Sequence, residues 1–208
     1  MSRLADPRFA VLREALAAYA SDPDDPTPAP SEPLQAAVAL VVRAGDALEV
    51  LLIKRAKRAG DPWSGHMALP GGRRDAEDES LLHTAMRETR EETGVALAER
   101  GVHLGRLEEV RPQSASLPRL SVTPHVFGVP AGTRALVASA EVEAVHWVAI
   151  DRLRHSDTRN EVEIPLPGGA RSFPCLTVGD DVVWGLTYRI LDEFLARAPE
   201  VFPLPRGS

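Results

Sequence analysis

LPGGRRDAEDESLLHTAMRETREETGV, residues 69–95, places a Gly-Gly turn and an acidic loop directly before a helical segment that ends at a glycine. A glycine after the last periodic residue is the usual C-terminal signal of a helix. Glu88, Glu91 and Glu92 are spaced i, i+3 and i+4, so on a helix they share one face. Arg87 precedes Glu91 by four residues, which predicts an ion pair that holds the Glu91 side chain.

This glutamate face favours a metal-binding site over an ordinary solvated helix surface. Three like charges about one turn apart repel one another unless a cation lies among them. No lysine is interleaved on the face, and the preceding Gly71-Gly72 pair permits close backbone approach. Hard divalent cations prefer carboxylate oxygens, so the sequence predicts a Mg²⁺ site, with Mn²⁺ as a substitute.

The same residues carry a resemblance to a known family. Arg87 to Val95, RETREETGV, resembles the REUXEEXGU core of the Nudix box, with Thr89 at a usually aliphatic position. Glu79 stands where that box places its first glutamate. The glycine expected six residues earlier is Arg73 here, and the Gly-Gly pair comes just before it. This displacement resembles the coenzyme A diphosphatase branch, whose box reads PGG followed by a longer acidic turn.

Two further segments are similar to the same branch. Leu52 to Ala56, LIKRA, looks like the branch motif L-T-x-R-[S/A], which implies that Arg55 contacts the substrate. The continuation departs from the motif, because Gly60 occupies the step where an arginine is expected and Gly65 arrives one residue late. Near the C-terminus, Trp184 to Thr187 resembles the W-G-x-T sequence ahead of the last helix in that branch.

The resemblance implies a Nudix α/β/α sandwich with a mixed central sheet, and Mg²⁺-dependent hydrolysis of a nucleoside diphosphate derivative. Glu141 and Glu143 resemble the carboxylates outside the box that family members recruit as an extra ligand or as the base. Which carboxylate takes the proton from water stays open. The residues expected at the site are, for the metal, Glu79, Glu88, Glu91 and Glu92; for catalysis, Arg87, Glu88, Glu91 and Glu141; and for the substrate, Arg55, Trp63, Gly71, Gly72 and Arg119.

Several substrate-contacting candidates have a competing structural interpretation. Trp63 can stack on a nucleobase or cover the sheet, and aromatic stacking is worth about 1–3 kcal/mol per base. Arg119, like Arg111, borders the substrate loop of the resembling family or is a surface charge. The basic run Lys54 to Arg58 either clamps a diphosphate or discourages pairing at a strand edge.

The composition limits the classes of protein to which this chain can belong. The 208 residues, 44% apolar and 26% charged, suffice for one globular domain with a full core. A net charge of −6 argues against nucleic acid as a partner. Cys175 is the only cysteine, which excludes an intrachain disulfide. No signal-peptide or membrane-length apolar run is present, so we expect a cytoplasmic protein that does not bind membranes.

Along the chain we expect three parts: an N-terminal helix with a proline-rich linker (1–33), the catalytic domain (34–198) and a tail (199–208). The helix, Pro7 to Ala20, is expected to pack on the main domain or on a partner chain in a homodimer. Asp75 or Asp78 is expected to cap the glutamate-bearing helix, and Val183-Trp184 to open the last helix. Strands are expected at 36–42, 47–53, 66–69, 103–110, 120–129, 140–150, 161–167 and 171–178, in a central sheet covered on both sides.

The substrate predicted from the resemblance is coenzyme A or its thioesters, cleaved to 4′-phosphopantetheine and adenosine 3′,5′-bisphosphate. The alternatives within the enzyme class are ADP-ribose, another nucleoside-diphosphate derivative or an oxidised nucleotide. An alternative outside that class is a non-catalytic ligand-sensing domain. The presence of all four box glutamates favours an enzyme.

Overall fold

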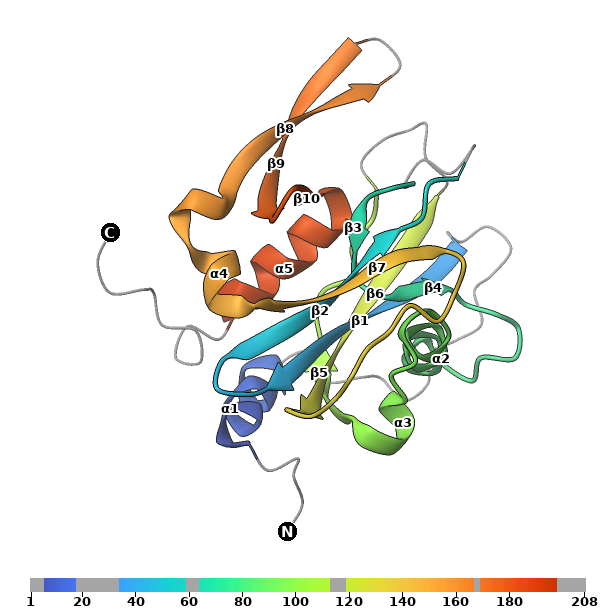
Figure 1. The fold of residues 1–208 in the computed structure, drawn as a ribbon. Helices are drawn as coiled ribbons and strands as arrows, with labels where there is room; N and C mark the ends of the chain where they lie inside the picture. The colour runs from blue at the N-terminus through green and yellow to red at the C-terminus, as the bar shows by residue number, and fades with distance from the viewer. Residues whose placement is uncertain (1–5, 18–33, 59–63, 113–118, 167–168, 198–208) are drawn as a thin grey trace.

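The structure is a computed structural model that describes residues 6–17, 34–58, 64–112, 119–166 and 169–197 (Figure 1). Its centre is a hairpin of two apolar strands, β1 (Leu34–Ala44) and β2 (Leu48–Arg55), as predicted. Five further strands extend this sheet: β3 (Met67–Ala68), β4 (Gly71–Arg73), β5 (Val102–Arg106), β6 (Leu120–Pro130) and β7 (Val142–Ala149). The order is β3-β2-β1-β6-β5, with β4 also paired to β1 and β7 to β2.

The central sheet is mixed, as expected from the resemblance. β1 runs parallel to β6 along its whole length, whereas its pairings with β2 and β4 are antiparallel. Successive β1 residues point to opposite faces and both faces are buried, because Leu40 belongs to one core cluster and Ala39 and Val41 to the other. A continuous apolar run is what a strand covered on both sides requires.

Helices cover both faces of this sheet and make it the middle layer of a sandwich (Figure 1). The first core cluster joins the sheet to α1 (Pro7–Leu16), α4 (Ile150–Arg154) and α5 (Gly185–Arg197). The second joins it to α2 (Leu81–Thr93) and α3 (Leu97–Arg100). The predicted α/β/α architecture is therefore confirmed.

The N-terminal helix α1 packs on its own domain, one of the two placements expected for it. Phe9, Leu12 and Leu16 are buried in the first core cluster. Two glycines make room for the helix: a Cβ on Gly128 would lie 2.8 Å from the Phe9 ring, and one on Gly105 would lie 2.7 Å from Leu16 Cβ. The helix ends at Leu16, and the remainder of the expected helix, residues 18–20, lies outside the described residues.

The C-terminal region forms a second sheet of three strands, ordered β10-β9-β8. The predicted hairpin is present as β8 (Arg159–Leu166) and β9 (Gly169–Val178), and it projects away from the main sheet in Figure 1. The prediction that Val183 and Trp184 open the last helix is wrong. They belong to β10 (Asp181–Trp184), where β-branched residues suit a strand, and α5 begins after them at Gly185.

Helix α2 begins and ends with identifiable capping residues. Ser80, rather than Asp75 or Asp78, is the N-cap: its side chain accepts a hydrogen bond from the His83 N–H at 3.1 Å. At the other end Gly94 adopts φ +70°, as predicted for a glycine cap. Across the described segments, no helix is long and apolar enough to span a bilayer.

Candidate metal centre and active site

Two glycines bring the backbone of β4 against the glutamate face of α2. Gly71 has φ +153°, and a Cβ there would lie 2.6 Å from Val38 Cα, because β4 pairs closely with β1. A Cβ on Gly72 would lie 2.5 Å from Glu88 Cδ. Only glycine at both positions allows the strand and the carboxylate to occupy this space. Direct contact of either glycine with a substrate stays a prediction.

Glu92 is the most buried of the box glutamates, with 5% of its surface exposed. Its Oε2 accepts a hydrogen bond from the Gly71 N–H at 2.8 Å. Burial raises the pKa of Glu92 to about 7; the charges of Glu88 and Glu141 act in the same direction, while the Gly71 hydrogen bond and Arg55 oppose it. A carboxylate in this setting is stabilised by an added positive charge.

Glu88 lies beside it, one helical turn earlier and half-buried. Burial raises the pKa of Glu88, and Glu91 adds to the effect, whereas the Arg87 guanidinium opposes it. Glu91 lies farther out, with 57% of its side chain exposed. Glu88 and Glu92 therefore form the inner pair of the face, and Glu91 is its outer member.

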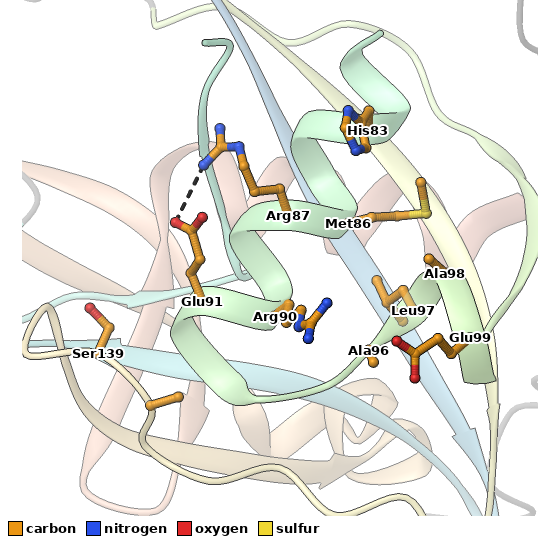
Figure 2. Close-up of a pocket in the computed structure, with 11 residues that line it drawn as sticks. His83, Met86, Arg87, Arg90, Glu91, Ala96, Leu97, Ala98, Glu99 and Ser139 are labelled. Carbon is orange, nitrogen blue, oxygen red and sulfur yellow. Dashed lines mark hydrogen bonds and ion pairs between the residues drawn. The ribbon is translucent and has the colours of Figure 1, made fainter. Parts of the chain in front are cut away.

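Arg87 connects the inner face to the acidic loop. Its Nε donates to Asp78 Oδ1 and its Nη2 to Asp78 Oδ2, both at 2.9 Å, and its Nη1 donates to Glu88 Oε1 at 2.9 Å. The predicted pair with Glu91 is present but longer, at 3.4 Å (Figure 2). The hydrogen bonds with Asp78 raise the pKa of Arg87, so the guanidinium is a fixed charge.

Asp78, which the sequence predicts only as a possible helix cap, is the buried partner that holds Arg87. Its side chain is 2% exposed and also accepts hydrogen bonds from Thr84 Oγ1 at 2.8 Å and the Asp75 N–H at 3.0 Å. Burial opposes its ionisation, but these bonds and Arg87 hold the pKa of Asp78 well below its usual range. Several acids share this loop, so the sequence alone does not single out Asp78.

Arg55 and Glu141 reach the same place from neighbouring strands. Arg55 ends β2 opposite Val142 of β7, and the Ala56 N–H donates to the Glu141 carbonyl at 2.8 Å. Both charges act on the pKa of Glu92, in opposite directions. The structure thus brings Arg55, Glu88, Glu92 and Glu141 together at one end of the sheet. These four come from β2, α2 and the segment before β7.

Other candidates are not brought to this centre. Glu143, weighed with Glu141, instead pairs with Lys54 at 3.3 Å, and Lys54 also contacts Asp181 at 2.9 Å. Glu79 is exposed, and its backbone carbonyl accepts from Arg74 at 3.2 Å. The role of Glu79 as a metal ligand stays a prediction.

The two loop arginines are on the surface, in contacts that do not involve the cluster. Arg119 is exposed, and its carbonyl accepts from the Leu34 N–H at 2.9 Å. Arg111 pairs with Glu109 at 2.7 Å on the surface. Trp63 lies outside the described residues. Their contacts with a substrate stay predictions.

A hollow of about 810 Å³ adjoins the outer side of α2. Figure 2 shows Arg87 and Glu91 along one side of it, Met86 and Leu97 on the other, and Arg90 between them. The inner pair of glutamates packs instead against the glycines of β4. Of the residues assigned to the candidate centre, Arg87 and Glu91 are the ones that line the hollow.

The donor set fits a hard divalent cation in its chemistry. The charges of Glu88 and Glu141 both act on the buried carboxyl of Glu92, and a buried carboxyl with a raised pKa gains from a neighbouring cation. Within the described ranges, no three acidic, histidine or cysteine side chains already stand in a coordinating arrangement. Arg87 holds Glu88 and Arg58 holds Glu141, so these side chains would turn from the arginines to bind a metal.

Comparison with known sequences identifies the family. The NUDIX domain profile matches residues 33–166. The chain belongs to the Nudix family. A crystal structure of a MutT/nudix family protein from Enterococcus faecalis superposes with a TM-score of 0.56 over 93% of this chain and 79% of that one, at 18% identity, which supports the Nudix fold.

Curated relatives extend the similarity. The mitochondrial coenzyme A diphosphatase NUDT8 of Homo sapiens is 34% identical over 149 residues, covering 70% of this chain and 60% of that protein. An uncharacterized Schizosaccharomyces pombe protein is 36% identical over 118 residues, 55% of this chain and 36% of its own. The uncharacterized Nudix hydrolase NudL of Yersinia pestis is 30% identical over 129 residues, 62% of each. The chain thus spans between 36% and 62% of the length of these relatives.

Proposed function

We propose that this Nudix protein is a divalent-cation-dependent hydrolase that cleaves the diphosphate of coenzyme A or its thioesters. The products would be 4′-phosphopantetheine and adenosine 3′,5′-bisphosphate. The observation that carries the proposal is the inner pair Glu88 and Glu92, packed on Gly71-Gly72 with Arg55 beside them. The likeness to the human coenzyme A diphosphatase supports this substrate.

Glu88, Glu91 and Glu92 would hold the cation, Mg²⁺ or Mn²⁺, and Glu79 would complete the set through a water molecule. When bound, the cation would neutralise the charge of the diphosphate and lower the pKa of a bound water. The protein side chains have separate tasks. Arg87 fixes Glu88 by an ion pair at 2.9 Å, and the Gly71 N–H fixes Glu92.

Arg55 at the end of β2 and Glu141 before β7 supply the remaining chemistry. The Arg55 guanidinium can donate two hydrogen bonds to a phosphate, which positions the diphosphate over the glutamates. Glu141 or one of the α2 glutamates accepts the proton of the attacking water. Glu141 suits this task because its side chain is 47% exposed and its charge acts on Glu92.

A hydrolysis panel tests the proposal. Coenzyme A, its thioesters, ADP-ribose, a dinucleoside polyphosphate and nucleoside triphosphates are each incubated with Mg²⁺, and the products are identified by mass. Release of 4′-phosphopantetheine and adenosine 3′,5′-bisphosphate is expected. Preferred turnover of ADP-ribose would replace the substrate, and no turnover of any diphosphate would support a ligand-sensing domain instead.

Two variants connect that activity to the site. Glu88→Gln and Glu91→Gln remove charge without changing shape, and each should lose most turnover while the fold is kept. Glu99→Gln is the matched control, because Glu99 is an exposed glutamate on α3 beside the hollow and away from the inner pair. Wild-type turnover of Glu91→Gln at saturating Mg²⁺ would remove Glu91 from the metal site.

The assembly and location of the enzyme belong to the same proposal. We expect a cytoplasmic protein that acts on a small molecule and binds neither nucleic acid nor membranes. A homodimer is also expected, and sedimentation of the purified chain would test it. Because Phe9, Leu12 and Leu16 of α1 are buried on its own domain, a dimer would not use these side chains.

A further inference from the structure

Arg58 makes an ion pair with the carboxylate that approaches the candidate centre from outside the box. Its Nη1 donates to Glu141 Oε1 at 2.7 Å, and its backbone N–H donates to Ser64 Oγ at 2.6 Å. The side chains of Arg58 and Glu141 are 56% and 47% exposed. Water and dissolved ions therefore reach this pair, and an exposed pair is readily exchanged.

Glu141 is held at the centre by its backbone and not only by Arg58. Its carbonyl accepts from the Ala56 N–H at 2.8 Å, and its own N–H donates to Ser139 Oγ at 3.2 Å. Its charge is close enough to Glu92 to act on the pKa of that buried carboxyl. Loss of the Arg58 contact would thus leave Glu141 where it is, with its carboxylate available.

Apart from Arg55, which the proposed function already places on the diphosphate, Arg58 is the best placed of the basic run to exchange partners. Lys54 is already held by Asp181 and Glu143 at 2.9 and 3.3 Å. Lys57 is exposed and carries a point charge without the planar fork of arginine. A guanidinium matches a carboxylate and a phosphate equally well in geometry, so one group can serve both in turn.

We propose that Arg58 is a positioning residue that holds Glu141 beside the candidate centre in the unliganded protein and exchanges it for a phosphate of the substrate. The ligand class is a nucleoside diphosphate, so the inference rests on the proposed function and deepens it. When the diphosphate takes the guanidinium, the Glu141 carboxylate becomes available to the cation or to the water proton. The exchange makes or breaks no covalent bond.

Two affinities that move in opposite directions test the exchange. Arg58→Ala should bind Mg²⁺ alone more tightly, by about two- to fivefold, because Glu141 no longer has a competing partner. The same variant should bind α,β-methylene-ADP, a diphosphate that is not hydrolysed, about tenfold more weakly, because charge-assisted hydrogen bonds are lost. Both are measured by isothermal titration calorimetry on the full chain. A variant that is merely less well folded would lose affinity for both.

Lys57→Ala is the matched control, since it removes the same charge from the adjacent exposed position. It should move both affinities by a smaller factor than Arg58→Ala. Arg58→Lys should restore part of the affinity for the diphosphate, because it keeps the charge and loses the fork. If Lys57→Ala reproduced both changes, the effect would be a general one of charge and the exchange would be refuted.

A double-mutant cycle isolates the contact itself. In a Glu141→Gln background, Arg58→Ala should no longer tighten Mg²⁺ binding, because the competing pair is absent from both proteins. The same gain in both backgrounds would overturn the proposal. These measurements need no turnover, so a protein that hydrolyses no diphosphate could still show the exchange. Conversely, if the enzyme is active but Arg58→Ala binds Mg²⁺ with unchanged affinity, the proposed function stands and the exchange is refuted.

Discussion

Replacing Glu92 by glutamine should stabilise the metal-free protein while it removes activity. Glu92 is 5% exposed and its pKa is raised to about 7, so at neutral pH the fold carries a carboxyl that resists ionisation. Glutamine keeps the shape of the side chain and the oxygen that accepts from the Gly71 N–H. The charge is removed and the hydrogen bond stays.

The magnitude follows from the difference in pKa between the folded and unfolded states. A carboxyl whose pKa rises from 4.5 to about 7 on folding costs about 3 kcal/mol of folding free energy at pH 7, because a tenfold change in a proton-binding constant is worth about 1.4 kcal/mol. Because the folded pKa is the higher one, Glu92 costs no stability below pH 4.5, and the cost develops as the pH rises from 4.5 through 7. The variant lacks that loss.

The assay is chemical and thermal unfolding in EDTA, from pH 4.5 to 8, for the wild type and Glu92→Gln. The variant should exceed the wild type by about 2–3 kcal/mol at pH 7, roughly 5–10 °C in Tm for a chain of this size, and by little at pH 4.5. Glu91→Gln is the stability control, because the neighbouring glutamate is 57% exposed. It should change the unfolding free energy by less than about 0.5 kcal/mol.

Mg²⁺ should make the wild type more stable than Glu92→Gln, the reverse of their order in EDTA. A cation that binds the folded wild type raises its stability by mass action, whereas the variant lacks one ligand and should respond less. A variant that melts below the wild type at every pH would falsify the idea that burial strains Glu92. A difference independent of pH would show that its source is packing and not ionisation.

Three further predictions concern the supports of the site and the core. Asp78→Asn should destabilise the fold by about 2–4 kcal/mol in urea unfolding, because it leaves Arg87 without its buried partner, while the same change at exposed Asp75 should cost little. Gly72→Ala should strongly lower kcat in the hydrolysis assay while it changes the melting temperature little, since the added methyl displaces the Glu88 carboxylate. Burial, followed by the charges of His103 and Arg106, lowers the pKa of His125 to about 3. The free energy of unfolding should therefore be about 2 kcal/mol lower at pH 5 than above pH 6.5, because the unfolded chain binds the proton more readily. His125→Gln should abolish this loss in unfolding experiments across that pH range.

The sheet and the box helix could be predicted because their signals are local. The apolar runs on either side of Gly45 predict a hairpin buried on both faces, and the structure has one. Gly94 marks the end of α2 correctly. In each case the residue types and their spacing in a short stretch determine the element, whatever packs on it.

The errors in the contacts around Arg87 have a common cause, which is competition between side chains for the same partner. Asp78 is a good capping residue by type, but it lies buried against Arg87, so the cap falls to Ser80. The Arg87–Glu91 pair has ideal helical spacing, yet Asp78 and Glu88 take the shorter contacts. The burial of Glu92 likewise follows from the approach of β4, which spacing along α2 does not encode.

These contacts also explain how the carboxylate cluster is stable without a metal. Each carboxylate of the cluster has a partner that takes the place of a cation: Arg87 for Glu88, the Gly71 N–H for Glu92 and Arg58 for Glu141. The partners differ in strength, because Arg87 is itself fixed by Asp78 whereas Arg58 is exposed. Binding of a cation has to displace or share them, which lowers the affinity for the metal alone. A diphosphate that draws Arg58 away removes part of that competition, so metal and substrate should each strengthen the binding of the other.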